Sequence, residues 1–239
     1  MRESGPLQAD LSTTGPSVAA VIARLRGIDD ELTDSDGAAV FNRVYLTVTE
    51  EVAAGLERAQ VFRDPVFMAH LDVTFAGLWL EAYDAPDDDV PKAWAALFES
   101  RHDRSVLPIQ FALAGMNSHI AHDLPVAVVR TCRDLGASPH DAGVHDDYEK
   151  VNDLLAACEA KIRRSFLTEA AQAAEAHIGA VAHLISSWKI DKARDAAWVN
   201  VEALWSMRGL GALADRYRES LARTVGMTSR CLLTPLVGK

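Results

Sequence analysis

The chain has 239 residues, of which 49% are hydrophobic and 24% are charged, and its formal net charge at pH 7 is −10. A chain of this length and composition can bury a sizeable core, which excludes disorder over most of its length. The acidic balance argues against a nucleic-acid-binding protein, because contacts to the phosphate backbone need clustered Lys and Arg.

The first 16 residues are polar and contain two Gly-Pro pairs, so we expect a disordered arm there. From residue 17 onward, apolar residues recur at helical spacing almost everywhere. In chain order, the predicted helices cover 17–32, 36–59, 64–83, 91–101, 107–136, 145–167, 173–207 and 212–227.

Capping residues mark the start of several of these helices. Ser17 and Asp36 are suitable N-caps, and Asp64 is followed by Pro65, a favoured residue in the first turn. Pro125 lies inside a predicted helix, where we expect a kink. No alternating run long enough for a strand and no repeat at a fixed period is found. We therefore predict one all-α domain over 17–239, a bundle of about eight to ten helices.

Neither a membrane span nor a secretory signal is expected from the sequence. The chain has no uninterrupted apolar stretch near 18 residues, and its N-terminus lacks an apolar segment. Cys132, Cys158 and Cys231 are widely spaced, which is typical of reduced thiols. These features predict a cytoplasmic protein that does not bind membranes, and they do not indicate an oligomeric state.

One stretch, "FALAGMNSHIAHDLP" at 111–125, places four polar side chains in an apolar helix. They are Asn117, His119, His122 and Asp123. His119 and Asp123 are four residues apart and share a helix face, so a nitrogen and an oxygen can converge on one zinc or iron ion. Without a metal, the same pair is an imidazole–carboxylate dyad for acid–base catalysis. In a purely structural alternative, Asp123 caps the segment that begins at Pro125 and His119 is a hydrogen-bonded core residue.

Other helices also carry polar side chains among apolar ones. Asp72 lies in "AHLDVTFAGLWLEAY", where a lone carboxylate needs a partner. Asp147 and Asn152 lie near the start of another helix, where acidic residues also complement the helix dipole. Arg194 is on a stripe with Trp198 and Trp205, and we expect it to point inward and pair with Asp72 or Asp123. That pairing would make the whole set a structural salt-bridge network.

The runs "LPIQFALAGMNSHIAHDLPVAVV", "LDVTFAGLWLEAY", "DYEKVNDLL" and "ARDAAWVNVEALW" resemble a family of uncharacterised actinobacterial proteins over about 36–210. The resemblance implies no activity, but it implies which positions belong together. They are Asp72, Asn117, His119, Asp123, Asp147, Asn152, Arg194 and Trp198; His122 is a variation of this sequence.

"HIAHDLP" is also similar to the "HFxGDxHQP" helix of the zinc-dependent phospholipase C and S1/P1 nuclease fold. That similarity implies metal ligation by His119 and Asp123, with Asp72 as a third ligand. The histidine that follows the aspartate in that family is missing here, as are its N-terminal Trp ligand and its second His-rich helix. A three-zinc site is therefore not expected, and a single divalent ion, zinc or iron, is the form that remains.

Together these residues predict an enzyme, a hydrolase or a cyclase or isomerase, that acts on an apolar metabolite. The candidate catalytic residues are His119, Asp123, Asp147 and Arg194. The candidate substrate-binding residues are Asn117, Asn152, Trp79 and Trp198. The candidate metal ligands are His119, Asp123 and Asp72, completed by His122 or Asp147. The alternatives are a non-catalytic small-molecule carrier and a helical interaction protein whose polar cluster is structural.

Overall fold

The computed structural model describes residues 17–58, 61–173 and 189–236, and in these residues it contains helices and no strand. The prediction of an all-α bundle is confirmed. The α-helices are α1 (Val18–Glu31), α2 (Gly37–Glu57), α3 (Pro65–Asp84), α4 (Lys92–Ser100), α5 (Pro108–Ser118), α6 (Leu124–Asp134), α7 (Val144–Ala173), α9 (Ile190–Ser206) and α10 (Gly211–Leu232). The expected arm over 1–16 and residues 174–188 of the helix predicted over 173–207 lie outside the described residues. That helix is not continuous as predicted, because Lys189 has an extended backbone and α9 begins after it.

The predicted N-caps are confirmed at the start of the first three helices. The side chains of Ser17, Asp36 and Asp64 accept backbone N–H groups of their own first turns at 3.2, 2.8 and 2.8 Å. Asp36 is also bound by Nη2 of Arg101 at 2.6 Å, which ties the start of α2 to the end of α4. These contacts fix where the helices begin and how α2 and α4 meet.

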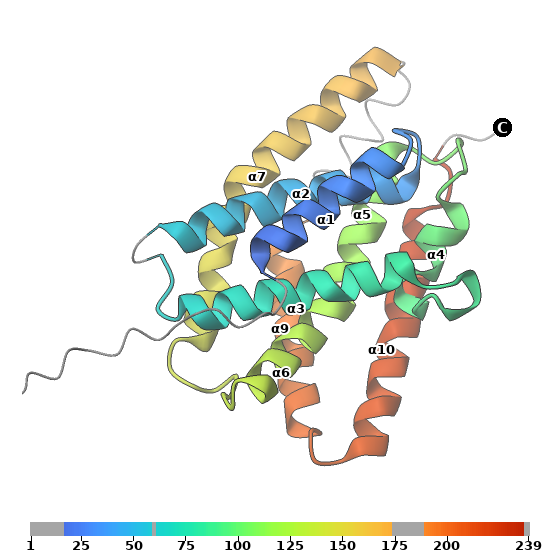
Figure 1. The fold of residues 1–239 in the computed structure, drawn as a ribbon. Helices are drawn as coiled ribbons and strands as arrows, with labels where there is room; N and C mark the ends of the chain where they lie inside the picture. The colour runs from blue at the N-terminus through green and yellow to red at the C-terminus, as the bar shows by residue number, and fades with distance from the viewer. Residues whose placement is uncertain (1–16, 59–60, 174–188, 237–239) are drawn as a thin grey trace, which may run out of the picture.

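Figure 1 shows α1, α2 and α3 lying across one side of the bundle, with α10 running crosswise to them. Helix α5 packs against both α2 and α10, and α6 packs between α3 and α9. The last turns of α7 extend beyond the other helices in this view (Figure 1). The segment from α5 to α6 therefore runs through the middle of the molecule, with α2 and α3 on one side and α9 and α10 on the other.

The buried side chains form two apolar cores that meet at this central segment. One core contains Phe41, Trp94 and Phe111, from α2, α4 and α5. The other contains Leu71 and Val201, with further residues of α6 and α7. The site described below lies where these two cores adjoin.

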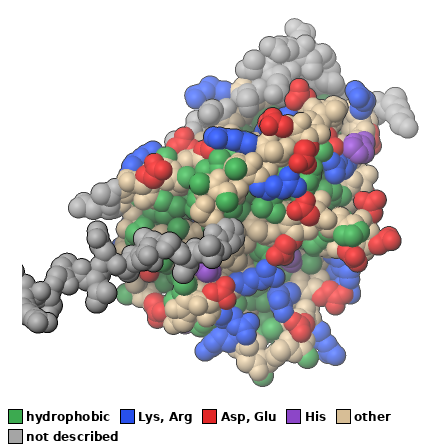
Figure 2. Space-filling view, viewed as in Figure 1, with side chains coloured by type: hydrophobic (Ala, Val, Ile, Leu, Met, Phe, Trp, Pro, Cys, Tyr) green, Lys and Arg blue, Asp and Glu red, His purple; other side chains and the backbone are tan. Residues whose placement is uncertain are grey.

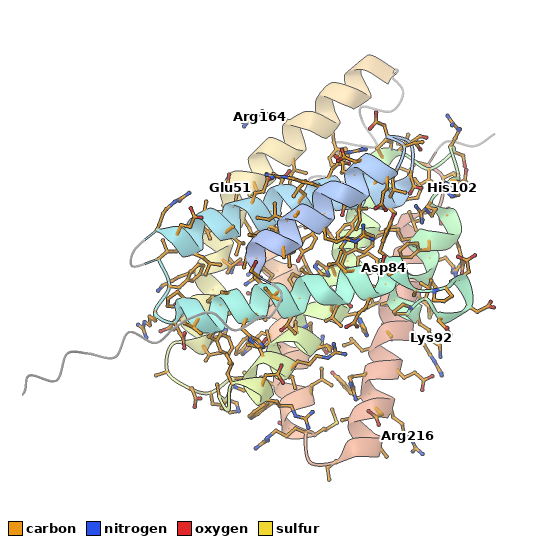
Figure 3. The ribbon with its side chains drawn as sticks, in the orientation of Figure 1. Glu51, Asp84, Lys92, His102, Arg164 and Arg216 are labelled. Atoms are coloured by element: carbon orange, nitrogen blue, oxygen red, sulfur yellow. The ribbon has the colours of Figure 1, made fainter. Side chains whose placement is uncertain are left out.

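On the face shown in Figure 2, acidic and basic side chains are intermingled rather than gathered into patches of one sign. Asp84, Lys92 and Arg216 lie on the outside of the bundle (Figure 3). Lys92 pairs with Glu219 of α10 at 2.7 Å, an exposed ion pair of the kind that contributes little stability. Among the described residues, no helix is long and apolar enough to cross a membrane.

Candidate functional site

The helix that carries the polar cluster is interrupted by a wide turn, η2 (His119–Asp123), which has π-helical hydrogen bonding. The N–H of Leu124 donates to the carbonyl of His119, five residues earlier. Pro125 follows directly, and proline has no N–H and crowds the carbonyl four residues before it. The widened turn, with its extra residue, accommodates the proline, while the kink predicted at Pro125 stays a prediction. Turns of this type occur often at functional sites.

Three donors surround the carboxylate of Asp123. Nδ1 of His119 lies 3.0 Å from Oδ2, and Nε1 of Trp94 donates to the same oxygen at 3.0 Å. Nδ1 of His122 lies 2.7 Å from Oδ1. Asp123 makes no side-chain bond to the start of α6, so it is not the helix cap considered as an alternative. The predicted His119–Asp123 pair exists, and both of its side chains are buried.

Aromatic rings hold the imidazole of His119 in one orientation. The ring of Phe75 stacks on it with 3.6 Å between centroids and an angle of 9°, and Tyr45 meets it edge-on at 4.4 Å. Because Nδ1 faces Asp123, Nε2 is on the opposite side of the ring. Nε2 is buried and has no hydrogen-bond partner among the described residues.

A cavity of about 90 Å³ lies beside this ring, between α2, α3, η2, α7 and α9. At about 30 Å³ per water, it has room for roughly three waters or a small organic molecule. Most of its wall is apolar, from residues such as Val44, Leu71 and Val151.

Three side chains of the cavity wall carry buried polar atoms that have no partner in the described part of the chain. They are Nε2 of His119, Oδ2 of Asp72 and the hydroxyl of Tyr45. Unpaired buried polar groups are rare in folded proteins because each costs free energy. Their concentration around one apolar cavity marks it as the candidate site.

Burial moves the pKa values of these groups in opposite directions. It raises the pKa of Asp72 from 3.8 to about 7. It also lowers the pKa of His119 below 6.5, and this exceeds the opposite effect of the bond to Asp123. Burial by itself would raise the pKa of Asp123, but the bonds from His119 and His122 hold it below its usual value. At neutral pH the site therefore contains an ionised Asp123, a neutral His119 and an Asp72 that is partly protonated.

Arg194 points inward, as predicted, but its predicted ion pair with Asp72 or Asp123 is wrong. Its Nε donates to the side-chain oxygen of Asn152 at 2.6 Å, and its Nη2 donates to the backbone carbonyl of Tyr148. Its guanidinium also lies over the Tyr148 ring, 4.0 Å from the centroid. Helix α7 supplies all of these contacts, and they hold the guanidinium against α7. The salt-bridge network considered as a structural alternative does not form in this arrangement.

The proposed metal ligands do not fit a metal centre. His119 and Asp123 bind each other instead of facing a common point, and Trp94 and His122 occupy two further acceptor positions of the carboxylate. Over the described parts of the chain, no group of three or more His, Cys, Asp or Glu side chains is placed to hold a metal ion. Asp72 lines the same cavity as His119 without joining it in such a group.

Two other predicted residues have contacts away from the cavity. Asp147 accepts the backbone N–H groups of Arg63 and Asp64 at 2.9 and 2.8 Å, which holds the segment before α3. These bonds outweigh the effect of burial and lower its pKa. Asn117 donates to the carbonyl of Val225 at 3.1 Å and so joins α5 to α10. Neither side chain belongs to the cavity wall.

The remaining predicted substrate-binding residues surround the site without lining it. Asn152 holds Arg194 in place. Trp198 packs on the Tyr148 ring at 4.8 Å between centroids. Trp79 is fully buried, where its indole donates to Asn42 at 3.2 Å.

Sequence reasoning missed Tyr45, Phe75 and Trp94 as parts of the site. All three lie on regular amphipathic helices, where an aromatic residue is indistinguishable from an ordinary core residue. Phe75 shares a helix face with Asp72, which was the one available signal.

Comparison with known families gives one match. Residues 18–235 match the model of a family of unknown function, DUF5995. The chain belongs to this family. Its resemblance to an uncharacterised family is thereby confirmed, and the family description supplies no activity. Comparisons with curated proteins and with solved structures found no match.

Proposed function

We propose that this DUF5995 protein is an enzyme that transfers protons on a small, largely apolar molecule. His119 is the general base and Asp72 is the general acid. The observation that carries the proposal is that Nε2 of His119 and Oδ2 of Asp72 are both buried without partners on the wall of one apolar cavity. Pairs of titratable groups whose environments move their pKa values apart are typical of acid–base sites.

The contacts of His119 suit it to the role of base. When its Nδ1 carries the proton, that N–H donates to Asp123 and leaves a lone pair on Nε2. Asp123 then stabilises the imidazolium that forms when Nε2 takes a proton from the substrate. His122 and Trp94 are positioning residues, because they hold the carboxylate of Asp123 from its other sides.

Asp72 suits the role of acid because its pKa, about 7, keeps a large share of it protonated at neutral pH. The raised pKa of Tyr45 keeps its hydroxyl protonated as a hydrogen-bond donor. In one turnover His119 removes a proton from one substrate atom and Asp72 delivers a proton to another. Exchange with solvent restores both residues. The product is an isomer or a cyclised form of the substrate.

Two other functions are compatible with the same residues. Hydrolysis would use His119 to activate a water molecule instead of the substrate. A non-catalytic carrier is favoured by one specific observation, the mainly apolar wall of the cavity.

Deuterium incorporation tests the proposal with a mixture of candidate substrates. The protein is incubated in D₂O with a small-molecule extract, and mass spectrometry then identifies compounds that gain carbon-bound deuterium. We expect incorporation with the wild type, and its loss in His119→Gln and Asp72→Asn. His140→Gln is the matched control, because this side chain is exposed and lies outside the cavity.

The stability of His119→Gln separates catalysis from a structural role. A glutamine amide can still donate to Asp123, so we expect the melting temperature to change by only a few degrees while incorporation is lost. Equal incorporation by wild type and His119→Gln would contradict the proposal. A compound that is retained by the protein but gains no deuterium would identify a carrier.

A further inference from the structure

Arg194 is a buried cation whose hydrogen-bonding capacity is only partly used. The side chain is 5% exposed and lies on the wall of the cavity. A guanidinium has five N–H donors. Two of them bind Asn152 and the Tyr148 carbonyl, so three (5 − 2) have no acceptor among the described residues.

Among the described residues, no carboxylate forms a direct ion pair with Arg194. The two groups that accept its hydrogen bonds are an amide oxygen and a carbonyl oxygen, and the ring beneath it is neutral. Two carboxylates act on its charge without contacting it: Glu149 accepts from the bridging Asn152 at 2.9 Å, and Asp195 pairs with Lys192 at 2.9 Å.

A buried charge without a direct counter-charge is unfavourable, and arginine keeps its proton under these conditions. Burial lowers the pKa of Arg194 from 12.5, because it disfavours the charged form of the side chain. An anion in the cavity would supply a direct counter-charge and accept hydrogen bonds from the unused N–H groups. The planar fork of a guanidinium matches a carboxylate in particular.

We infer that the cavity binds a small carboxylic acid in its ionised form, with the carboxylate held by Arg194 and the apolar body packed against the wall. A carboxylate is favoured over a phosphate, because a dianion would leave excess charge buried in apolar surroundings. A cavity of about 150 Å³ holds the six carbons of benzene, so a volume of about 90 Å³ encloses the carboxylate and only the first carbons of its chain. This inference names the substrate class of the proposed enzyme and rests on that function, but its test needs binding and no turnover.

The test compares linear carboxylates of four to eight carbons with their neutral primary amides by isothermal titration calorimetry at pH 7.5. Hexanoate and hexanamide are the central pair, because they have nearly the same shape and differ in charge. We expect wild-type protein to bind hexanoate at least tenfold more tightly than hexanamide. Equal affinity for the two, or no binding of any acid in the series, would overturn the inference.

Variants then assign the preference to Arg194. Arg194→Met keeps the length of the side chain and removes the charge, so we expect the preference for hexanoate to disappear. Arg194→Lys keeps the charge and should retain part of the preference, which gives a second measurement if Arg194→Met does not fold. Arg208→Met is the matched control, because Arg208 also covers an aromatic ring, that of Trp205, but is exposed. A preference for hexanoate that persists in folded Arg194→Met would overturn the assignment.

These experiments test the carboxylate inference and the proposed chemistry independently. His119→Gln should still prefer hexanoate, because in the proposed arrangement Arg194, and not His119, binds the carboxylate. Loss of deuterium incorporation with an intact acid preference would contradict the proposed chemistry alone. Deuterium incorporation without an acid preference would contradict the carboxylate inference alone.

Discussion

The carboxyl group of Asp72 is buried, and no cation among the described residues pairs with it. Its pKa is raised from 3.8 to about 7 by burial. The folded protein therefore holds a proton on Asp72 between these two pH values, where the unfolded chain has lost it. The free energy of unfolding falls as pH rises from about 4 to about 7. Above that range Asp72 is ionised in the folded protein, and the whole decrease in the free energy of unfolding is present.

Replacement of Asp72 by asparagine removes the buried carboxyl group, and with it the loss of stability at high pH. Each pKa unit corresponds to about 1.4 kcal/mol, so the shift to about 7 corresponds to on the order of 4 kcal/mol at most. We expect Asp72→Asn to stabilise the protein by about 2–4 kcal/mol at pH 8 and to have little effect near pH 4. Urea unfolding at the two pH values measures the difference. The same stability change at both pH values would show that Asp72 is not the titrating group.

Single residues of the site could be predicted, but their partners on other helices could not. Asp72, His119, Asp123 and Arg194 were found because each is polar on an apolar helix. The His119–Asp123 pair follows from a spacing of four within one helix. Arg194 was assigned to the wrong partner, because its partner depends on how α9 packs against α7. That packing is set by apolar contacts that are not visible in the spacing of charged residues.

Among the helices, the regular ones could be predicted and the irregular turn could not. Helical periodicity and caps such as Ser17, Asp36 and Asp64 were sufficient to predict most helix boundaries. The wide turn η2 was not predicted, because a π-helical turn differs from an α-helical one by a single residue and has no distinct apolar pattern. Its position before Pro125 is the only local signal.

Close approach of helices also depends on single residues. At Gly226 of α10, an added Cβ would lie 2.2 Å from the backbone carbonyl oxygen of Lys92, at the start of α4. A backbone atom cannot move aside as a flexible side chain can. The contact between α10 and α4 therefore requires glycine at this position.

Two glycine-to-alanine substitutions test this contact. Gly226→Ala must push α10 away from α4, so we expect a loss of about 1–3 kcal/mol in the free energy of unfolding. Gly77→Ala in α3 is the control, because an added Cβ there would meet no atom within 4 Å. Alanine favours helix over glycine, so Gly77→Ala should stabilise the protein by up to about 1 kcal/mol. Chemical denaturation of both variants decides the matter, and equal effects of the two would refute the packing argument.

At the scale of the whole molecule, the site lies where the two apolar cores meet. Phe41 of one core and Leu71 of the other both line the cavity. The cavity leaves packing contacts unmade, and its wall holds polar atoms without partners. A bundle built for stability alone would fill this space with apolar side chains. The unfilled cavity with its unpaired polar groups is therefore better explained by a ligand than by the needs of folding.

A comparison of two buried hydroxyl groups separates an effect on stability from a role in ligand binding. The hydroxyl groups of Tyr45 and Thr131 are both buried without partners, but only Tyr45 lines the cavity. Removal of an unpaired buried hydroxyl leaves no partner unsatisfied, so Tyr45→Phe and Thr131→Val should each stabilise the protein by up to about 1 kcal/mol. For a chain of this size, that corresponds to a rise of about 2–4 °C in melting temperature.

The two variants should differ in function. We expect Tyr45→Phe to weaken ligand binding or slow deuterium incorporation, because the cavity loses a donor, and Thr131→Val to leave both unchanged. Thermal unfolding, calorimetry with hexanoate and the deuterium assay on the same preparations provide the comparison. If Tyr45→Phe gains stability with no change in binding or incorporation, the Tyr45 hydroxyl is not part of the site. A ligand then contacts only the ionisable groups of the wall: Asp72, His119 and Arg194.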